Sequence, residues 1–333
     1  MAKIRMGLIG TGRIGQVHAA SIAESELFEL TYTADTFVDG AEKVATRYGG
    51  KYTSDPEELF LSGDVDAVLI ASPTATHIDL IRQSIAQNLH VLCEKPIDLD
   101  IERVDEIRPL AAAANTQIAL GFNRRFDPNF SAIRSRVESG EIGNLEQLII
   151  ISRDPAPASQ DYIAVSGGIF RDMTIHDFDM ARYFVPEIIS VSATGSNSFC
   201  DYIAAENDFD SATTVLRGAK GEIVTIVNSR HSAFGYDQRI EAFGSAGMLV
   251  ADNVQTSTIR AFKANGVEAA EPYPTFFLER YAEAYRLELE EFGKGILSGQ
   301  FSNPNFEDGR AALMLADAAS ESARTGRSVS VTL

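Results

Sequence analysis

The feature that most constrains the fold is a glycine loop that directly follows the first apolar segment. Ile4–Ile9 has the composition of a buried strand, and the chain then continues as G-x-G-x-x-G with its last glycine at Gly15. Glycines at this spacing allow a tight turn, close approach of the backbone to a diphosphate and close helix–strand contact. They would also suit a plain strand-to-helix turn, but the strand–turn–helix context favours nucleotide binding. We therefore expect these loop residues to contact a dinucleotide: Gly10, Thr11, Gly12, Arg13 and Ile14.

Short apolar runs alternate with helical patterns from the N-terminus to Gly121. The runs are Ile4–Ile9, Phe28–Ala34, Val65–Ala71, Leu89–Cys93 and Gln117–Gly121. Strands that alternate with helices imply right-handed crossovers and a parallel sheet with both faces covered. We therefore predict a doubly wound α/β domain over residues 1–121.

Beyond Gly121 the pattern changes. A strand is expected over Leu145–Ser152, and after the helix Arg171–Phe184 come strand-like stretches that are separated only by turns. They are Ile188–Ser196, Ser211–Arg217, Glu222–Ser229, Tyr236–Gly244 and Met248–Ala251. This succession predicts a large, mostly antiparallel sheet with one open face, in an α+β domain over residues 122–333.

Four helices are expected around that sheet, the first over about Asn129–Ser139. One covers Arg171–Phe184, and another carries Tyr281, Tyr285, Leu289, Phe292 and Ile296 on one face. The last covers residues 306–324, with Asn305 as its N-cap, and could pack back on the first domain.

Asp35 follows the second apolar run directly. A carboxylate at this place can accept hydrogen bonds from both ribose hydroxyls of NAD, and it would repel a 2′-phosphate. Thr36 and Phe37 come next, so no arginine stands ready for that phosphate. An ordinary turn or N-cap aspartate is the alternative. We expect NAD rather than NADP.

The segments after the third and fourth apolar runs are also candidates, because the carboxyl ends of parallel strands face the ligand crevice. Ser72, Pro73 and Thr74 follow the third run, with His77 within one turn of them. A lone histidine there would equally suit a cap or a partly buried position. Lys95 follows the fourth run. It could hydrogen-bond a substrate hydroxyl, or be a solvated turn lysine.

Asp172 and His176 are four residues apart on the predicted helix Arg171–Phe184 and would project from one face. A carboxylate beside an imidazole orients the ring and increases its basicity, as removal of a hydroxyl proton requires. The pair could equally be a surface interaction worth a few tenths of a kcal/mol. No third ligand has convincing spacing, so we expect no metal site.

Charge and cysteine content narrow the partners and the compartment. The formal charge is -18, from 29 basic and 47 acidic side chains, so nucleic acids and anionic membranes are poor partner candidates. The two cysteines, Cys93 and Cys200, lie far apart, which fits a reducing compartment. No apolar run is long enough to span a bilayer, and the first strand begins at about Lys3, which leaves no room for a signal peptide. We expect a cytoplasmic protein.

Six sequence motifs run in one order over nearly the whole chain. They are GLIGTGRIG near the start, CEKP at 93–96, GFNRRFD at 121–127, SRDPAP at 152–157, SGGIFRDMTIHDFD at 166–179 and FGYDQRIEAFGSAG at 234–247. Together they resemble the Gfo/Idh/MocA oxidoreductases, and within that family the branch that oxidises inositols. The resemblance implies an N-terminal Rossmann domain that binds NAD, and oxidation of a cyclic polyol, myo-inositol to 2-keto-myo-inositol (scyllo-inosose).

The resemblance also implies residue roles. His176 matches the family's general base, Asp172 its orienting partner and Lys95 the group that hydrogen-bonds the reacting oxygen. Substrate contacts are implied for Lys95, Arg125, Asp154, Asp172, His176 and Tyr236. Further cofactor contacts are implied for Glu94, Lys95, Asn123 and Arg124. A cis peptide before Pro96, and a homotetramer assembled through the open sheet face, are implied in the same way.

Two other functions compete with this one. The same scaffold could act on scyllo-inositol or an aldose, because pocket details that motif spacing does not set decide between such substrates. It could also be a non-catalytic NAD(H)-binding regulator. Lys95, Asp172 and His176 count against a regulator, since a sensor needs no base.

Overall fold

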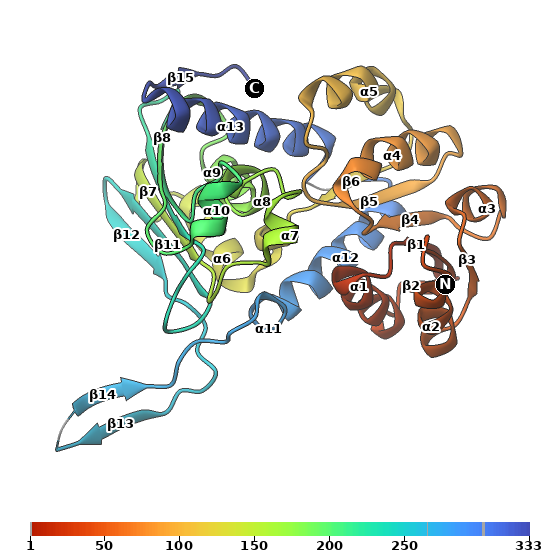
Figure 1. Ribbon diagram of the computed structural model, residues 1–333, viewed down its shortest axis with the longest axis horizontal. Coiled ribbons are helices and arrows are strands. Elements are labelled where there is room, and N and C mark those ends of the chain that lie inside the picture. Colours follow the sequence, from red (N-terminus) through yellow and green to blue (C-terminus); the bar gives the residue numbers. More distant parts are fainter. Residues whose placement is uncertain (1, 265, 302–303) are drawn as a thin grey trace. The chain divides into compact units, whose positions relative to one another are not determined.

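The computed structural model describes residues 2–264, 266–301 and 304–333, and its backbone divides into two compact units (Figure 1). The first comprises residues 1–126 and 283–313, and the second residues 127–282 and 314–333. Within the described ranges, none of the helices combines the length and the apolar character that a membrane span requires.

The first unit is built on a six-stranded sheet in the order β3-β2-β1-β4-β5-β6, and every neighbouring pair is parallel. The strands are β1 (Ile4–Ile9), β2 (Phe28–Ala34), β3 (Lys51–Thr53), β4 (Ala67–Ile70), β5 (His90–Glu94) and β6 (Ile118–Gly121). The helices are α1 (Arg13–Glu24), α2 (Val38–Tyr48), α3 (Pro56–Leu61), α4 (His77–Ala86), α5 (Ile101–Ala113) and α12 (Ala282–Ser298), with 3-10 turns η1 (Thr74–Thr76) and η2 (Asn123–Phe126). This confirms the doubly wound parallel sheet. The strand order reverses between β1 and β4, where such folds bind their ligands.

A late helix completes the core of this unit. Leu289 and Phe292 of α12 are buried with the apolar residues of β1 and β2, and the rings of Phe28 and Phe292 stack with centroids 6.2 Å apart. The expected apolar face is confirmed for these two residues and for Tyr285, which is also buried. The prediction is wrong for Tyr281, which lies outside α12 and is the C-cap of the preceding short helix, α11 (Phe277–Arg280).

The second unit is built on a seven-stranded sheet in the order β12-β11-β7-β10-β9-β8-β15. The strands are β7 (Leu145–Arg153), β8 (Ile188–Ser196), β9 (Ser211–Gly218), β10 (Ile223–Ser229), β11 (Asp237–Gly244), β12 (Gly247–Ala251) and β15 (Val329–Ser330). β7 and β10 are parallel, and the other neighbours are antiparallel. The mostly antiparallel sheet is therefore confirmed.

The other elements of the second unit are mostly short. They are α6 (Pro128–Glu138), α7 (Gln160–Ile163), α8 (Ile169–Asp172), α9 (Ile175–Phe184), α10 (Asp201–Ala205), α11, the small hairpin β13 (Arg260–Lys263) and β14 (Gly266–Ala270), and part of α13 (Phe306–Thr325). Asn305 accepts a 3.1 Å hydrogen bond from the backbone N–H of Asp308 through its side chain, which confirms it as the N-cap of α13.

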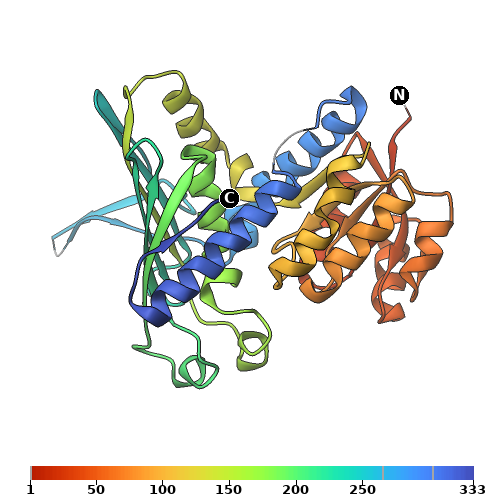
Figure 2. The ribbon, with the colours of Figure 1, turned by 90° about the horizontal axis from the view of Figure 1, so that it is seen from above.

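The two faces of the seven-stranded sheet differ in burial. Figure 2 shows α8 and α9 against one face, where Leu148, Val224 and Ile240 are buried. Strand alternation and register put a second set of apolar side chains together on the opposite face. They are Val215, Ile223, Phe243, Met248 and Val250, each between 37% and 51% exposed. This set is called the open face below.

Candidate active site

The glycine loop after β1 is shaped by contacts that only glycine permits. Gly10 has φ 96°, and a Cβ on it would lie 2.6 Å from the backbone of Ala71. A Cβ on Gly15 would lie 2.1 Å from the carbonyl oxygen of Gly10. At Gly12 a Cβ would meet nothing within 4 Å. Two of the glycines therefore close the turn, and the middle one leaves space in front of the helix N-terminus.

Asp35 ties this loop to the end of β2. Its Oδ2 accepts hydrogen bonds from the backbone N–H and the hydroxyl of Thr11, both at 2.6 Å. Its Oδ1 accepts one from the backbone N–H of Phe37 at 2.8 Å. Burial disfavours the carboxylate, but these hydrogen bonds outweigh it and lower the pKa of Asp35 below its ordinary value. The side chain is thus ionised and fixed beside the glycine loop. The expected ribose contact stays a prediction.

The loops after β4 and β5 are joined by His77. Its ring is buried at the start of α4, with Nδ1 2.8 Å from the Pro96 carbonyl oxygen and Nε2 2.9 Å from that of Ser72. Burial lowers the pKa of His77, although both carbonyls oppose this. The ring is thus buried near the helix start, and the cofactor contact expected for His77 stays a prediction. Pro73 is exposed and Thr74 half-buried in the loop that His77 supports.

Glu94 has a partner that the sequence did not reveal. His18, on α1, lies with Nε2 2.7 Å from Oε1 of Glu94, and both side chains are at least nine-tenths buried. The other carboxylate oxygen accepts a 3.3 Å hydrogen bond from the backbone N–H of Lys95. The bond between Lys95 and Pro96 is cis, as the resemblance implied. His18 and Glu94 lie far apart in the chain, so no local sequence pattern indicates that they pair.

The 3-10 turn η2, which follows β6, carries three further predicted residues. They are Asn123, Arg124 and Arg125, and all three are buried. Within the described ranges, Nδ2 of Asn123 is buried and finds no hydrogen-bond acceptor. Arg125 pairs with Asp308 at the start of α13, at 3.1 Å. The substrate role implied for Arg125 stays a prediction.

These features fit a bound dinucleotide. A diphosphate needs open space in front of a helix N-terminus, and Gly12 leaves that space in front of α1. An amide donor that is buried and unsatisfied, as on Asn123, is costly unless something else accepts its hydrogen bond. Thr11, Asp35 and the loops held by His77 surround the same strand ends.

In the second unit, the predicted helix Arg171–Phe184 is two helices. α8 ends at Asp172 and α9 begins at Ile175, so the expected placement of Asp172 and His176 on one continuous helix face is wrong. The break is held by Thr174, which is fully buried and whose hydroxyl donates to the side chain of Asn228 at 2.8 Å. His176 therefore lies in the first turn of α9, half-buried.

The Asp172 carboxylate is bound on both oxygens. Oδ1 accepts a 2.8 Å hydrogen bond from the hydroxyl of Tyr162, and Oδ2 lies 3.1 Å from Nη1 of Arg230. Neither partner was predictable from the sequence. Tyr162 and Arg230 belong to other segments of the chain. An arginine that directly follows a strand would be expected on the surface from sequence alone.

The two other predicted substrate residues of this unit lie at strand ends. Asp154 directly follows β7, and its backbone N–H donates to Ser229 at 2.9 Å. Tyr236 precedes β11, is 6% exposed and packs edge-on against the ring of Tyr281. Among the described residues, no group of three or more histidine, cysteine, aspartate or glutamate side chains could hold a metal ion.

Comparisons with known proteins place the chain. A profile described as an oxidoreductase family with an NAD-binding Rossmann fold matches residues 4–122, and the GFO/IDH/MocA C-terminal domain profile matches residues 130–250. An inositol 2-dehydrogenase from Rhizobium meliloti (strain 1021) is 43% identical over 98% of this chain and 99% of its own.

Solved structures agree over the full length. The crystal structure of a myo-inositol dehydrogenase from Corynebacterium glutamicum has a TM-score of 0.97 at 55% identity and covers 100% of both chains. That of a scyllo-inositol dehydrogenase from Lactobacillus casei, with bound NAD(H) and scyllo-inositol, has a TM-score of 0.92 at 29% identity and covers 99% of both. The chain therefore belongs to the Gfo/Idh/MocA oxidoreductases, with an NAD-binding Rossmann domain followed by the family's C-terminal domain.

Proposed function

We propose that this protein oxidises myo-inositol to 2-keto-myo-inositol with NAD as the oxidant. The observation that carries the proposal is the 55% identity, over the whole of both chains, to the myo-inositol dehydrogenase from Corynebacterium glutamicum. Relatives named for scyllo-inositol are less similar, at 31% identity for a Bacillus subtilis enzyme and 29% for the Lactobacillus casei structure. The myo isomer is accordingly the first candidate.

In this mechanism three side chains act on the hydroxyl group of one ring carbon: they remove its proton and stabilise its oxygen. An imidazole nitrogen of His176 removes the hydroxyl proton, and Asp172 orients the ring and stabilises the imidazolium that forms. The ammonium of Lys95 donates a hydrogen bond to the same oxygen as it becomes a carbonyl oxygen. Bound NAD supplies the hydride acceptor at C4 of its nicotinamide ring.

The remaining proposed residues bind and orient. Backbone N–H groups at Gly10–Ile14 would hold the diphosphate and Asp35 the ribose hydroxyls. The loops at Ser72–Thr74 and Glu94–Lys95, and the η2 residues Asn123 and Arg124, would hold the nicotinamide end. Arg125, Asp154 and Tyr236 carry the donors and acceptors that a ring of hydroxyls requires. Orientation by such groups lets the hydride leave the ring carbon while the proton leaves the hydroxyl oxygen on that carbon.

The decisive test is the initial rate of NADH formation with myo-inositol, scyllo-inositol and D-glucose as substrates. We expect the highest kcat/KM with myo-inositol. A higher value with scyllo-inositol or glucose would transfer the proposal to that substrate. No turnover with a wide set of cyclitols and aldoses, together with tight NADH binding, would favour a regulator.

His176→Ala tests the proton acceptor. It should reduce kcat by at least about a hundredfold while NADH binding, followed by fluorescence, stays within twofold of the parent. His231→Ala is the matched control, since His231 belongs to the same unit and is exposed. Equal loss in both variants would contradict the assignment of His176.

We also propose that the protein is a cytoplasmic homotetramer assembled through the open face. A set of five apolar side chains that are more than a third exposed, on one face of a sheet, is typical of an interaction surface. Val250→Asp should dissociate the assembly in light scattering. A parent protein that is monomeric at micromolar concentration would refute the proposal.

A further inference from the structure

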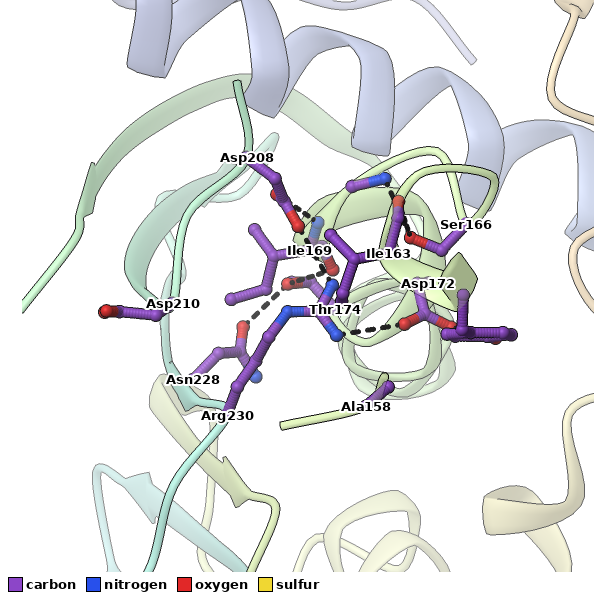
Figure 3. A network of polar contacts seen from close by, with 12 residues as sticks. Ala158, Ile163, Ser166, Ile169, Asp172, Thr174, Asp208, Asp210, Asn228 and Arg230 are labelled. Carbon is purple, nitrogen blue, oxygen red and sulfur yellow. Dashed lines mark hydrogen bonds and ion pairs between the residues drawn. The ribbon is translucent and has the colours of Figure 1, made fainter. Parts of the chain in front are cut away.

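The Asp172 carboxylate lies in a network of charges that is more elaborate than a base partner needs. Arg230 directly follows β10, is 1% exposed and pairs with two carboxylates (Figure 3). Its Nη1 lies 3.1 Å from Asp172 and its Nη2 lies 3.2 Å from Asp208. Burial disfavours the charge, but both carboxylates hold the pKa of Arg230 above its ordinary value.

Asp208 anchors the arginine to the backbone that carries Asp172. It follows α10, and its Oδ1 accepts a 2.7 Å hydrogen bond from the backbone N–H of Ile169, the first residue of α8. Asp172 is the last residue of α8. One guanidinium therefore connects, through Asp208, to the start of this four-residue helix and directly to its end.

Tyr162 completes the arrangement from another side. It belongs to α7, and its hydroxyl donates to the oxygen of Asp172 that Arg230 does not take. Burial of the hydroxyl and the nearby Asp172 charge raise the pKa of Tyr162, so the hydroxyl remains a donor at neutral pH. Asp154, after β7, adds a further negative charge that acts on both Tyr162 and Arg230.

Stability alone is a poor explanation for this network. A buried ion pair often contributes little net stability, because desolvation of the two charges offsets their attraction. Moreover, within the described ranges, Nε of Arg230 is buried without a hydrogen-bond partner, which is an added cost. The geometry instead serves to fix one carboxylate, with a donor on each oxygen.

We propose that Arg230 and Tyr162 are positioning residues that fix the Asp172 carboxylate and moderate the negative charge it presents to His176. The proposal rests on the function proposed above, in which Asp172 is the partner of His176. Two donors restrict the carboxylate to one orientation, and the guanidinium partly neutralises it. The imidazole is then oriented firmly but remains a base near neutral pH, rather than staying protonated beside a bare carboxylate.

The sign of the effect follows from electrostatics. When a donor to Asp172 is lost, more negative charge faces the imidazole of His176 and its protonated form is favoured. The titration midpoint of His176 should therefore rise in Tyr162→Phe by about half a unit, and in Arg230→Lys, which keeps the charge but loses the planar fork, by a similar amount.

The primary experiment measures that midpoint without substrate. The full-length protein is labelled at histidine Cε1, and its five histidines are titrated by carbon NMR, with the His176 signal assigned from His176→Gln. Tyr202→Phe is the matched control, because the Tyr202 hydroxyl donates to a backbone carbonyl, that of Ala158, at 2.8 Å. A rise in Tyr162→Phe but not in Tyr202→Phe supports the proposal, and equal midpoints in parent and Tyr162→Phe overturn it.

Kinetics separate this proposal from the one on which it rests. Tyr162→Phe should lower kcat at pH 7 by about three- to tenfold and shift the acid limb of the pH–rate profile upward, with KM for NAD unchanged. In an Asp172→Asn background the same substitution should have no further effect, because its action passes through the carboxylate. Additive losses would overturn the proposal.

Each failure has its own signature. A parent protein that oxidises no cyclitol, yet shows the NMR shift, loses the proposed function while Tyr162 and Arg230 keep their effect on His176. A parent that oxidises myo-inositol, with an unshifted His176 in Tyr162→Phe, keeps the proposed function and loses this inference. If Arg230→Lys does not fold, Tyr162→Phe alone decides.

Discussion

Two glycines of the same loop should fail in different ways when each is replaced by serine. At Gly15 the added Cβ would lie 2.1 Å from the carbonyl oxygen of Gly10, whereas at Gly12 it would meet nothing within 4 Å. Gly15 is therefore expected to serve the fold, and Gly12 to leave space for the dinucleotide. The Gly12→Ser and Gly15→Ser variants separate these two roles.

The magnitudes follow from the local geometry. An ordinary contact begins at 3.4 Å, so the backbone at Gly10 would have to move by about 1.3 Å, and overpacking of this kind costs about 1–3 kcal/mol. Serine regains about 0.5 kcal/mol over glycine in a helix, which leaves a net loss of about 1.5 kcal/mol and a Tm lower by about 3–6 °C. At the N-cap position of Gly12, serine is favoured by a few tenths of a kcal/mol.

Thermal unfolding without nucleotide, followed by NADH titration, measures both roles. Gly15→Ser should unfold at a lower temperature. Gly12→Ser should unfold within about 1 °C of the parent, yet bind NADH at least about tenfold more weakly, because its side chain occupies the space in front of the helix N-terminus. If Gly12→Ser bound NADH as the parent does, or Gly15→Ser lost no stability, the geometric reasoning would be refuted.

Three further predictions concern the first unit. Asp35→Ser should reduce the ratio of kcat/KM for NAD to that for NADP at least about tenfold, because the charge that repels a 2′-phosphate is gone; an unchanged ratio contradicts this. Burial raises the pKa of Cys93 well above its ordinary value, so a thiol reagent at pH 8 should label Cys93 only after denaturation, as peptide mass mapping would show. Because burial lowers the pKa of His77, its neutral ring contributes stability in full above the unfolded-state pKa of about 6.5. That stability is lost as the pH falls from there toward the lower folded-state pKa. Urea unfolding should show a smaller difference between pH 7.5 and 5.5 in His77→Asn than in the parent, and an equal difference would count against the role of burial.

Features with a local signal were predictable from the sequence. The glycine loop, the parallel strands of the first unit and the N-cap at Asn305 each depend on residues close together in the chain. The antiparallel sheet was equally accessible, because its strands are short and joined by turns. The resemblance to a family then supplied the roles of Lys95, Asp172 and His176, which spacing alone left open.

Features that depend on distant contacts were not predictable. The helical pattern runs through Met173 without a breaking residue, and the interruption there is held by the contact of Thr174 with Asn228, on β10. Likewise, nothing near Arg230 in the chain announces its partners, because Asp172 and Asp208 precede it on separate segments. Buried polar pairs of this kind are set by tertiary structure, and local propensity does not record them.

The late helix α12 has a consequence for how the chain is made. The first unit needs Leu289 and Phe292 to finish a core that begins with β1. During synthesis the ribosome delivers these residues only after six of the seven strands of the second sheet, β7 to β12, have been translated. Until then the N-terminal segment exposes apolar surface, and such surface is what chaperones bind. A nascent chain stopped at residue 126 should aggregate, and one extended past residue 313 should become protease-resistant.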